Sequence, residues 1–395
     1  MHLILFDDHT RLNLLPFTHT RPVADIRCGI LTMRERWERY LNLSSFTLTE
    51  PYLQHKYPFA AGADNLFVNA TVFATDELVA AIHLLQPGQC LVSATLLLAA
   101  RAGQETAALP IAAIRDAGTE VAFAGTVTRL DKLPDIFSMN DAALRSDFAF
   151  LTRGRVSQPI SDTNTVMGRE NVFLEEGAVV SCSIINATTG PVYVAKDAEI
   201  MEGCIIRGPL ALGEHAVLKM GAKIYGATTI GTGSKVGGEV NNVVFFANSN
   251  KGHDGFLGNS VVGEWCNFGA DSNNSNLKNN YDEVKLWSEQ ANRFAKTGLQ
   301  FCGLMMADHS KCGINTMFNT GTVIGVSCNI FGAGFPRNFV PSFSWGGASG
   351  FVQYDMDKAL LTADRVLGRR AMKMEEADRI IFNHVFEATA SQRNY

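Results

Sequence analysis

Aliphatic residues recur at every sixth position through the middle of the chain. The clean run holds eight of them: Val194, Ile200, Ile206, Leu212, Leu218, Ile224, Ile230 and Val236. Neither an α-helix nor an ordinary strand produces that spacing, because their periods are 3.6 and 2 residues. A period of six is typical of a hexapeptide-repeat solenoid, in which three short strands form one coil and one aliphatic side chain per strand points inward. The pattern therefore predicts a left-handed parallel β-helix.

The rhythm begins near Val172 and shifts after Val236. It resumes at Phe256, Val262 and Phe268, and again at Cys312, Phe318, Ile324 and Ile330. We expect roughly seven coils from these positions. Two segments interrupt the rhythm, at 241–255 and at 273–300. Because long excursions from a solenoid usually lie on its binding face, we expect the functional site there.

The first 150 residues follow a different pattern, in which short apolar runs alternate with segments of helical periodicity. We expect strands at 3–6, 66–68, 90–92 and 120–123, and helices at 25–41, 75–85 and 140–153, the second of them capped by Thr75. Such alternation predicts an α/β layer fold of the Rossmann-like type. The segment 355–391 again has helical spacing. We therefore predict an α/β domain at 1–153, a β-helix at 154–345 and a helical tail at 346–395.

Composition narrows the functional classes. The chain has 395 residues, 46% of them hydrophobic, and a net charge of -5. That charge argues against a nucleic-acid surface. The longest apolar tract, at 91–100, is too short to span a bilayer, and the start of the chain lacks the pattern of a secretory signal. The eight cysteines are scattered, which favours reduced thiols in a cytoplasmic protein.

His253 is the sharpest candidate for chemistry. It lies in a glycine-rich break of the coil rhythm, between Gly252 and Gly255. Imidazole titrates near neutral pH, so His253 has the chemistry of a general base that accepts a proton from an amine during acyl transfer. The alternative is a hydrogen-bonded surface or interface histidine. A metal site with His309 and His215 is disfavoured because these histidines are far apart in the sequence.

The segment around His253 resembles a known family. Three motifs carry the resemblance: Gly252-His253-x-x-Phe256-Leu257-Gly258, then Asn267-Phe268-Gly269-Ala270, then 274–285. They are similar, in order and spacing, to the acetyltransferase half of bifunctional glucosamine-1-phosphate N-acetyltransferase/N-acetylglucosamine-1-phosphate uridyltransferases. Further segments at 21–27, 146–155 and 238–242 look like a divergent subgroup of these enzymes.

The resemblance implies a role for each matching residue. His253 would be the general base, and Asn267 would position the amine and the acetyl thioester. Phe256 stands where the family has a substrate-contacting tyrosine, so that hydroxyl is missing. The remaining substrate contacts implied are Asn276 for the sugar, Lys219 and Lys285 for the phosphate, and Asn241 or Lys251 where the family has a second phosphate lysine.

The coil after the active site is similar to related acetyltransferases in which the pantetheine of acetyl-CoA lies along small residues. Gly321, Gly325 and Gly332 are the candidate lining residues, with glycines at coil corners as the alternative. The family resemblance also implies a homotrimer, with acetyl-CoA and a sugar phosphate as small-molecule partners.

The start of the chain resembles the opening of sugar-phosphate nucleotidyltransferases. The likeness lies in residues 11–22, which include Arg11, Thr18 and Arg21. By this resemblance these residues, with Arg27, would bind the nucleotide, and the three arginines would neutralise its phosphates. The expected glycine loop, lysine and metal aspartate are absent, since the loop reads Asp7-Asp8-His9-Thr10 and Thr71 replaces the carboxylate. The metal ligands stay unassigned. Activity of this domain would require UTP and Mg²⁺, and a degenerate domain kept for structure or regulation is the alternative.

The leading hypothesis is acetyl-CoA-dependent N-acetylation of an amino-sugar 1-phosphate, fused to an actual or former nucleotidyltransferase, for nucleotide-sugar and cell-envelope synthesis. One alternative is a sugar-1-phosphate nucleotidyltransferase, for uridylyl or thymidylyl transfer, whose β-helix serves only for trimerisation. A third is a non-catalytic assembly protein, which the family order of His253, Asn267, Asn276 and Lys285 disfavours.

Overall fold

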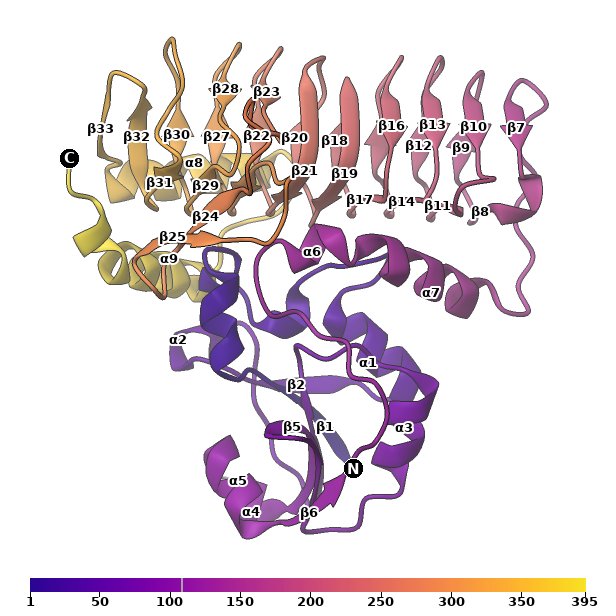
Figure 1. Cartoon of the computed structure of the whole chain (residues 1–395), viewed down its shortest axis with the longest axis vertical. Helices are drawn as coiled ribbons and strands as arrows, with labels where there is room; N and C mark the ends of the chain where they lie inside the picture. Colours follow the sequence, from indigo (N-terminus) through magenta and orange to yellow (C-terminus); the bar gives the residue numbers. More distant parts are fainter. Residues whose placement is uncertain (108) are drawn as a thin grey trace. The chain divides into compact units, whose positions relative to one another are not determined.

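The computed structural model describes residues 1–107 and 109–395, which form two compact units. The first unit comprises residues 1–14, 18–26 and 31–132. The second comprises residues 15–17, 27–30 and 133–395. Figure 1 shows the α/β elements of the first unit and the stacked coils of the second. The predicted fold class, an α/β domain plus a parallel β-helix with a helical tail, is confirmed.

A six-stranded mixed sheet forms the centre of the first unit, with the order β2-β1-β3-β5-β4-β6. Its strands are β1 (His2–Phe6), β2 (Ser45–Leu48), β3 (Asp64–Asn69), β4 (Gln89–Ser93), β5 (Leu96–Gly103) and β6 (Thr119–Ala122). Strand β1 pairs in parallel with both β2 and β3. The four predicted strands therefore all form, and the apolar tract at 91–100 is the β4–β5 hairpin.

In the described part of this unit, five α-helices accompany the sheet: α1 (Met33–Leu41), α2 (Pro51–Gln54), α3 (Asp76–His83), α4 (Gln104–Ala107) and α5 (Ile111–Ala117). Thr75 caps α3 as expected, because its hydroxyl accepts from the Leu78 N–H. The helix expected at 25–41 is wrong in its first part. Thr32 and Glu35 form a capping box that starts α1 at Met33, and residues 27–30 belong to the second unit.

Three flat faces make up the β-helix of the second unit. We call them faces A, B and C, because each turn of the chain passes from A to B to C and returns to A; the first strand of the β-helix, β7, lies on face B. Face A holds β9 (Val179–Val180), β12 (Glu199–Ile200), β15 (Val217–Leu218), β18 (Lys235–Val236), β20 (Asn250–Lys251), β22 (Asn267–Phe268), β27 (Lys311–Cys312), β30 (Asn329–Ile330), β32 (Ser344–Gly347) and β33 (Gly350–Gln353).

Face B holds β7 (Thr165–Met167), β10 (Ile184–Asn186), β13 (Ile205–Arg207), β16 (Lys223–Tyr225), the first halves of β19 (Glu239–Phe245) and β21 (Phe256–Val262), then β23 (Asn273–Asn274) and β28 (Met317–Phe318). Face C holds β8 (Val172–Leu174), β11 (Val192–Val194), β14 (Leu210–Leu212), β17 (Thr228–Ile230), the second halves of β19 and β21, then β26 (Met305–Met306), β29 (Val323–Ile324) and β31 (Phe339–Val340).

The aliphatic rows fill the interior of the coils, as the six-residue rhythm predicts. All eight residues of the clean run are at most 1% exposed. Two expectations need correction. Phe256 pairs with Glu239 and faces outward, and its neighbour Leu257 is the inward residue opposite Val240. The solenoid also has about ten turns, more than the roughly seven expected, because polar inward residues hide some coils from the pattern.

Helices cover part of the β-helix. Two of them, α6 (Asp135–Ser138) and α7 (Asn140–Thr152), precede the first coil, and the Asn140 side chain bonds to the Ala227 carbonyl and the Thr229 hydroxyl of face C. The tail forms α8 (Met356–Gly368) and α9 (Glu376–Ala388). Phe382 of α9 packs edge-on against His309, which stacks on Trp265. None of the helices in the described parts of the chain is long and apolar enough to cross a membrane.

Candidate functional site

Residues 252–255 form an unusual turn between faces A and B, which we call the histidine corner. Its end requires glycine. Gly255 has a φ of 117°, and a Cβ atom there would lie 2.2 Å from the Ser272 carbonyl oxygen. The preceding coil also comes close, because a Cβ on Gly238 would lie 2.9 Å from the His253 carbonyl oxygen. Within this backbone, the His253 side chain is exposed to solvent.

Lys219 lies on the same edge of the β-helix as the histidine corner. Gly237 separates the two, since a Cβ there would meet the Lys219 Cβ at 3.1 Å and the Gly252 carbonyl oxygen at 2.8 Å. The Lys219 side chain runs back toward Met201, with Nζ 3.4 Å from the sulfur. The structure therefore brings these two predicted site residues to one edge, with only small residues between them.

Asn267 lies on the face A side of that corner. Its Oδ1 accepts a 3.0 Å hydrogen bond from Nδ2 of Asn250. Asn250 in turn borders the histidine corner, because a Cβ on Gly252 would lie 3.1 Å from its Oδ1. A pair of side-chain amides thus connects Asn267 to the backbone that carries His253.

Phe256 and Asn276 meet on face B, over Gly258. A Cβ on Gly258 would lie 2.5 Å from the Phe256 ring and 2.7 Å from Nδ2 of Asn276. Asn241 aligns with Gly258 one coil earlier. The side chains of Phe256 and Asn276 therefore form a small surface directly after the histidine corner, at a point where glycine allows close approach.

Tyr225 and Glu239 lie beside that surface on face B. The Tyr225 hydroxyl donates to a Glu239 carboxylate oxygen at 2.5 Å. This hydrogen bond, together with burial and the nearby carboxylate charge, raises the pKa of Tyr225 to about 12. Tyr225 therefore keeps its proton across the physiological range and acts as a donor.

Two polar residues occupy inward positions next to this site, and the sequence analysis did not assign them that role. The Asn274 amide accepts from the Gly258 N–H at 2.8 Å and donates to the Gly258 carbonyl at 3.1 Å. Lys251 is 2% exposed and follows Val236 in the inward column of face A. The six-residue spacing could have shown that both residues point inward, because Lys251 follows the inward Phe245 by six residues and Asn274 follows Phe268 by six.

The Lys251 ammonium has no N–H donor left for a phosphate. Its ammonium donates to the carbonyl oxygens of Gly237, His253 and Gly255, at 3.0, 3.0 and 2.8 Å. These three bonds use all three N–H groups of a lysine. The expected phosphate contact of Lys251 is therefore not compatible with this arrangement.

Lys285 is not brought to the histidine corner within one chain. It lies on the hairpin of β24 (Lys285–Ser288) and β25 (Arg293–Lys296), which the excursion at 273–300 forms. There it lines a groove of about 1140 Å³, with Lys278, Trp287, Phe294, Arg337 and Phe339 among the other lining residues. The Trp287 ring stacks on Phe339 with centroids 4.7 Å apart.

The three glycines expected to line one acetyl-CoA groove lie at three different edges. Gly321 follows face B, and a Cβ there would lie 2.6 Å from the Lys285 carbonyl oxygen, so the hairpin covers it. Gly325 follows face C and is packed against Ser342. Gly332 follows face A, on the edge of the histidine corner, and has open space around it. Gly332 alone of these three fits the expectation.

The predicted nucleotide-binding residues of the first unit are largely used inside it. Arg11 is buried and donates to the Thr18 carbonyl at 2.8 Å, while the Thr18 hydroxyl donates to the Arg11 carbonyl at 2.8 Å. Arg21 is also buried. Arg27 belongs to the second unit, where its guanidinium donates to the Phe246 and Ile30 carbonyls. Backbone carbonyls therefore already accept from the side-chain donors of Arg11, Thr18 and Arg27.

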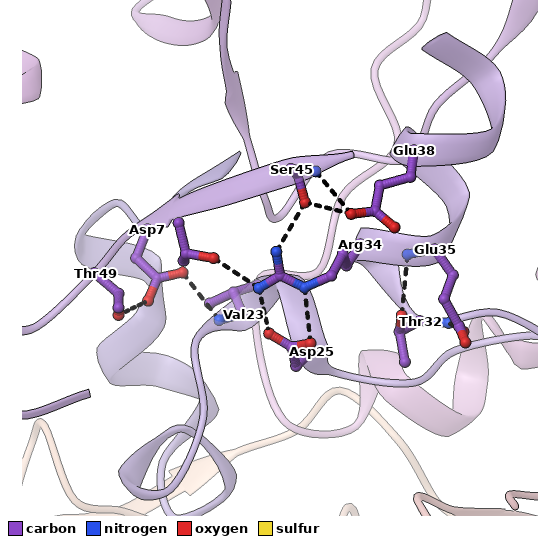
Figure 2. Close-up of polar contacts among 10 residues, drawn as sticks. Asp7, Val23, Asp25, Thr32, Arg34, Glu35, Glu38, Ser45 and Thr49 are labelled. Carbon is purple, nitrogen blue, oxygen red and sulfur yellow. Dashed lines mark hydrogen bonds and ion pairs between the residues drawn. The ribbon is translucent and has the colours of Figure 1, made fainter. Parts of the chain in front are cut away.

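Asp7 is a buried acid that directly follows β1. Figure 2 shows it bound by the Val23 N–H at 2.9 Å and the Thr49 hydroxyl at 2.6 Å. Burial raises the pKa of Asp7 to about 6, although these hydrogen bonds and the Arg11 charge act in the opposite direction. The carboxyl therefore titrates close to neutral pH.

Asp25 and Arg34 form a separate ion pair in the same close-up. Arg34 donates from Nε and Nη2 to the two Asp25 oxygens, at 2.9 and 2.7 Å (Figure 2). Asp25 is thereby committed to the guanidinium. Within the described residues, no group of three or more His, Cys, Asp or Glu side chains is arranged to hold a metal ion. The described residues therefore offer no preformed Mg²⁺ site of that kind.

The chain is similar in part to transferases. A model of the sugar nucleotidyl transferase family matches residues 3–156. The bifunctional protein GlmU of Methanocaldococcus jannaschii is 27% identical over 121 residues, which cover 30% of this chain and 24% of that protein. The putative uncharacterized acetyltransferase YaiX of Escherichia coli K12 is 28% identical over 143 residues, covering 36% of this chain and 61% of that protein. The chain thus spans less than two thirds of either relative.

Solved structures with partial likeness include two acyl-transferring proteins. The polySia-specific acetyltransferase NeuO is 16% identical, with a TM-score of 0.28, over 53% of this chain and 99% of that chain. The UDP-N-acetylglucosamine acyltransferase of Campylobacter jejuni is 14% identical, with a TM-score of 0.28, over 58% of this chain and 96% of that chain. At these scores neither carries an argument about activity.

Proposed function

We propose that the second unit transfers an acetyl group from acetyl-CoA to the amine of an amino-sugar 1-phosphate, with glucosamine 1-phosphate as the first substrate to test. One observation carries this proposal. The exposed His253 stands on a glycine-built corner, with Lys219 on the same edge and the Phe256–Asn276 surface directly after it. That arrangement places a base, a cation and a surface of one aromatic ring and one amide on neighbouring coils.

The chemistry assigned to His253 is proton transfer. A neutral imidazole accepts a proton from the attacking amine as the nitrogen bonds to the thioester carbonyl carbon. The carbon–sulfur bond then breaks, and the departing CoA thiolate takes up a proton. Asn267 is proposed to orient the amine and thioester, Asn276 and Phe256 to contact the sugar, and Lys219 to attract the phosphate as a point charge.

The acetyl-CoA arm is proposed to follow the edge between faces A and B. Gly252, Gly269 and Gly313 occupy the same position on successive coils of that edge, and Gly332 continues it. Small residues there leave the backbone accessible to an extended ligand. Since one convex edge gives a bisubstrate site few walls, we propose a homotrimer in which the 273–300 excursion of one protomer, with Lys285, reaches the histidine corner of the next.

A second candidate is sugar-nucleotidyl transfer by the first unit. The observation that favours it is the match of residues 3–156 to the sugar nucleotidyl transferase family. With both activities, the chain would serve the synthesis of a UDP-N-acetylglucosamine-type nucleotide sugar. We propose that this second activity is weak, because Arg11 and Thr18 bond to each other's backbone and the expected glycine loop is absent.

One assay separates the candidates. Purified protein is incubated with glucosamine 1-phosphate, acetyl-CoA, UTP and Mg²⁺, and the release of the CoA thiol and of pyrophosphate is followed separately. The proposal expects CoA release that requires the amino sugar. Release of pyrophosphate alone would favour a nucleotidyltransferase whose β-helix only assembles the protein. Release of neither product would leave a non-catalytic assembly role and would contradict the proposal.

A further inference from the structure

The buried Lys251 ammonium is the feature of the second unit that the proposed chemistry leaves unused. Its column in the interior of face A otherwise holds Ile200, Leu218 and Val236 on the preceding coils. A charged group in such a position is costly unless its donors are satisfied. A lysine at this point therefore needs a local reason.

The three acceptors of Lys251 supply that reason. The carbonyl oxygens of His253 and Gly255 lie on either side of the exposed turn, and that of Gly237 lies on the preceding coil. One ammonium thus ties the backbone of the histidine corner to its neighbouring coil from inside. The corner also has backbone bonds to neighbouring coils, since the Gly255 carbonyl accepts from the Glu239 N–H at 3.2 Å and the Asp254 carbonyl accepts from the Asp271 N–H at 3.0 Å. Lys251 adds the bond to the His253 carbonyl, in a corner where two of the four residues are glycines.

We propose that Lys251 is the positioning residue of the acetyl-transfer site, holding the backbone of residues 253–255 so that the His253 imidazole keeps its place on the edge of the β-helix. This inference rests on the proposed function for its kinetic consequences. It assigns Lys251 no contact with substrate, because all its donors face backbone carbonyls in the interior.

Protonation of Lys251 sets the strength of this support. Burial lowers the pKa of its ammonium to about 8, although Asp254, Cys312 and Asp271, the groups that face it, act to raise it. A neutral amine has two N–H donors for three carbonyl oxygens and presents a lone pair to the third. The support therefore weakens as the pH rises through about 8.

The contribution of Lys251 to the stability of the fold changes with pH in the opposite direction. The Lys251 pKa is lower in the folded state than in the unfolded chain, where the ordinary value is 10.5. Between those two values the unfolded chain binds more protons, so the contribution of Lys251 to the free energy of unfolding increases with pH. A positioning role thus predicts declining activity in a pH range where this residue makes the fold more stable.

The test compares Lys251→Met with Lys311→Met in the full-length protein. Lys311 is the matched control, because its ammonium also donates to a backbone carbonyl, that of His309 at 2.8 Å, and burial likewise lowers its pKa to about 8. We expect Lys251→Met to lower kcat by roughly 10²-fold, the scale of a misplaced catalytic group, with little change in sugar KM. Lys311→Met should keep kcat near wild type. Equal losses in both variants, or a loss in KM alone, would overturn the proposal.

The pH profile requires no substitution. Wild-type kcat should fall above about pH 8 while the midpoint of thermal unfolding does not fall with it, and Lys311→Met should retain that limb. A kcat that stays level to pH 9.5 would overturn the proposal. Lys251→Gln, which keeps two N–H donors, serves if the methionine variant does not fold, and should retain more activity than Lys251→Ala.

An activity-free arm separates this inference from the proposed function. Amide hydrogen exchange in Lys251→Met should accelerate at residues 237–239 and 252–256, with the coils of 192–230 unchanged. If wild-type protein releases no CoA but the exchange pattern appears, the proposed reaction fails while the structural support stands. If wild-type protein is active and exchange at the histidine corner is unchanged, the role of Lys251 fails alone.

Discussion

Nδ2 of Asn276 donates a 2.7 Å hydrogen bond to Oδ1 of Asn259, which ties the start of the long excursion to the coil of the histidine corner. Asn259 has a φ of 47° and ends the face B part of β21. The sugar-contacting side chain proposed at Asn276 is thereby held by the same strand that carries Phe256. We therefore expect the excursion and the histidine corner to respond together to mutation.

Asn276→Ala should raise the KM for the amino sugar, because the amide over Gly258 is removed, and should cost about 1 kcal/mol of stability for the lost hydrogen bond. Steady-state kinetics and thermal unfolding check the two effects. Asn279→Ala, an exposed position of the same excursion, is the control and should change neither. An unchanged KM in Asn276→Ala would remove this residue from the proposed site.

His253→Ala should lower kcat for acetyl transfer by roughly 10²–10⁴-fold, the usual contribution of a positioned general base. Sugar KM should change much less, because phosphate binding is assigned to lysines. The matched control is His215→Ala, another exposed histidine at a coil corner, 3.9 Å from Asp197, which should retain full activity. If His253→Ala folds normally and keeps wild-type kcat, the base lies elsewhere.

Lys285→Ala should raise sugar KM more than it lowers kcat, if the hairpin reaches the neighbouring protomer. Light scattering should give a mass near three protomers, in line with a site shared between chains. Mixed assembly of His253→Ala and Lys285→Ala protomers should then recover activity, because some interfaces combine an intact histidine with an intact lysine. Absence of recovery would place both residues in one chain or remove Lys285 from the site.

Asp7→Asn should stabilise the first unit above pH 6 and have little effect near pH 4. The pKa of Asp7 is raised from 3.8 to about 6 in the folded state, so the fold binds the extra proton and its free energy of unfolding falls as pH rises through that window. Asparagine keeps an acceptor for Val23 and avoids the buried charge. Hydrogen exchange of the β1 amides at pH 4.5 and 7.5 measures the difference.

Asp64→Asn is the control of opposite sign. The Arg101 guanidinium, hydrogen-bonded at 2.9 Å, holds the pKa of Asp64 below its ordinary value. Its contribution to stability is therefore present at neutral pH and is lost in acid, so this substitution should weaken the unit at pH 7.5. A gain in stability in both variants would contradict the assignment of the Asp7 effect to burial of its charge.

The sequence determined the architecture of the coils. Aliphatic side chains at six-residue intervals all point inward only if the chain turns after each short strand and three strands complete one coil. Val194 through Val236 show this directly, and all eight are buried. The same rhythm placed the excursions and His253 outside the regular coils. Local capping chemistry was equally visible, since Thr75 caps its helix as the sequence predicts.

Only the tertiary structure decided which side of a strand each residue near the site takes. Phe256 and Leu257 are both apolar. A six-residue step back from the inward Val262 points to Phe256, but the step is five residues here, so Leu257 is the inward residue opposite Val240. A lysine such as Lys251 can bind phosphate, but this one is buried and its ammonium donates to backbone carbonyls instead. Separation in space also divided Gly321, Gly325 and Gly332 among three edges. Sequence periodicity shows how often the chain turns. Whether a residue points inward or outward depends on the exact length of each turn. The partners of a polar side chain depend on residues from neighbouring coils.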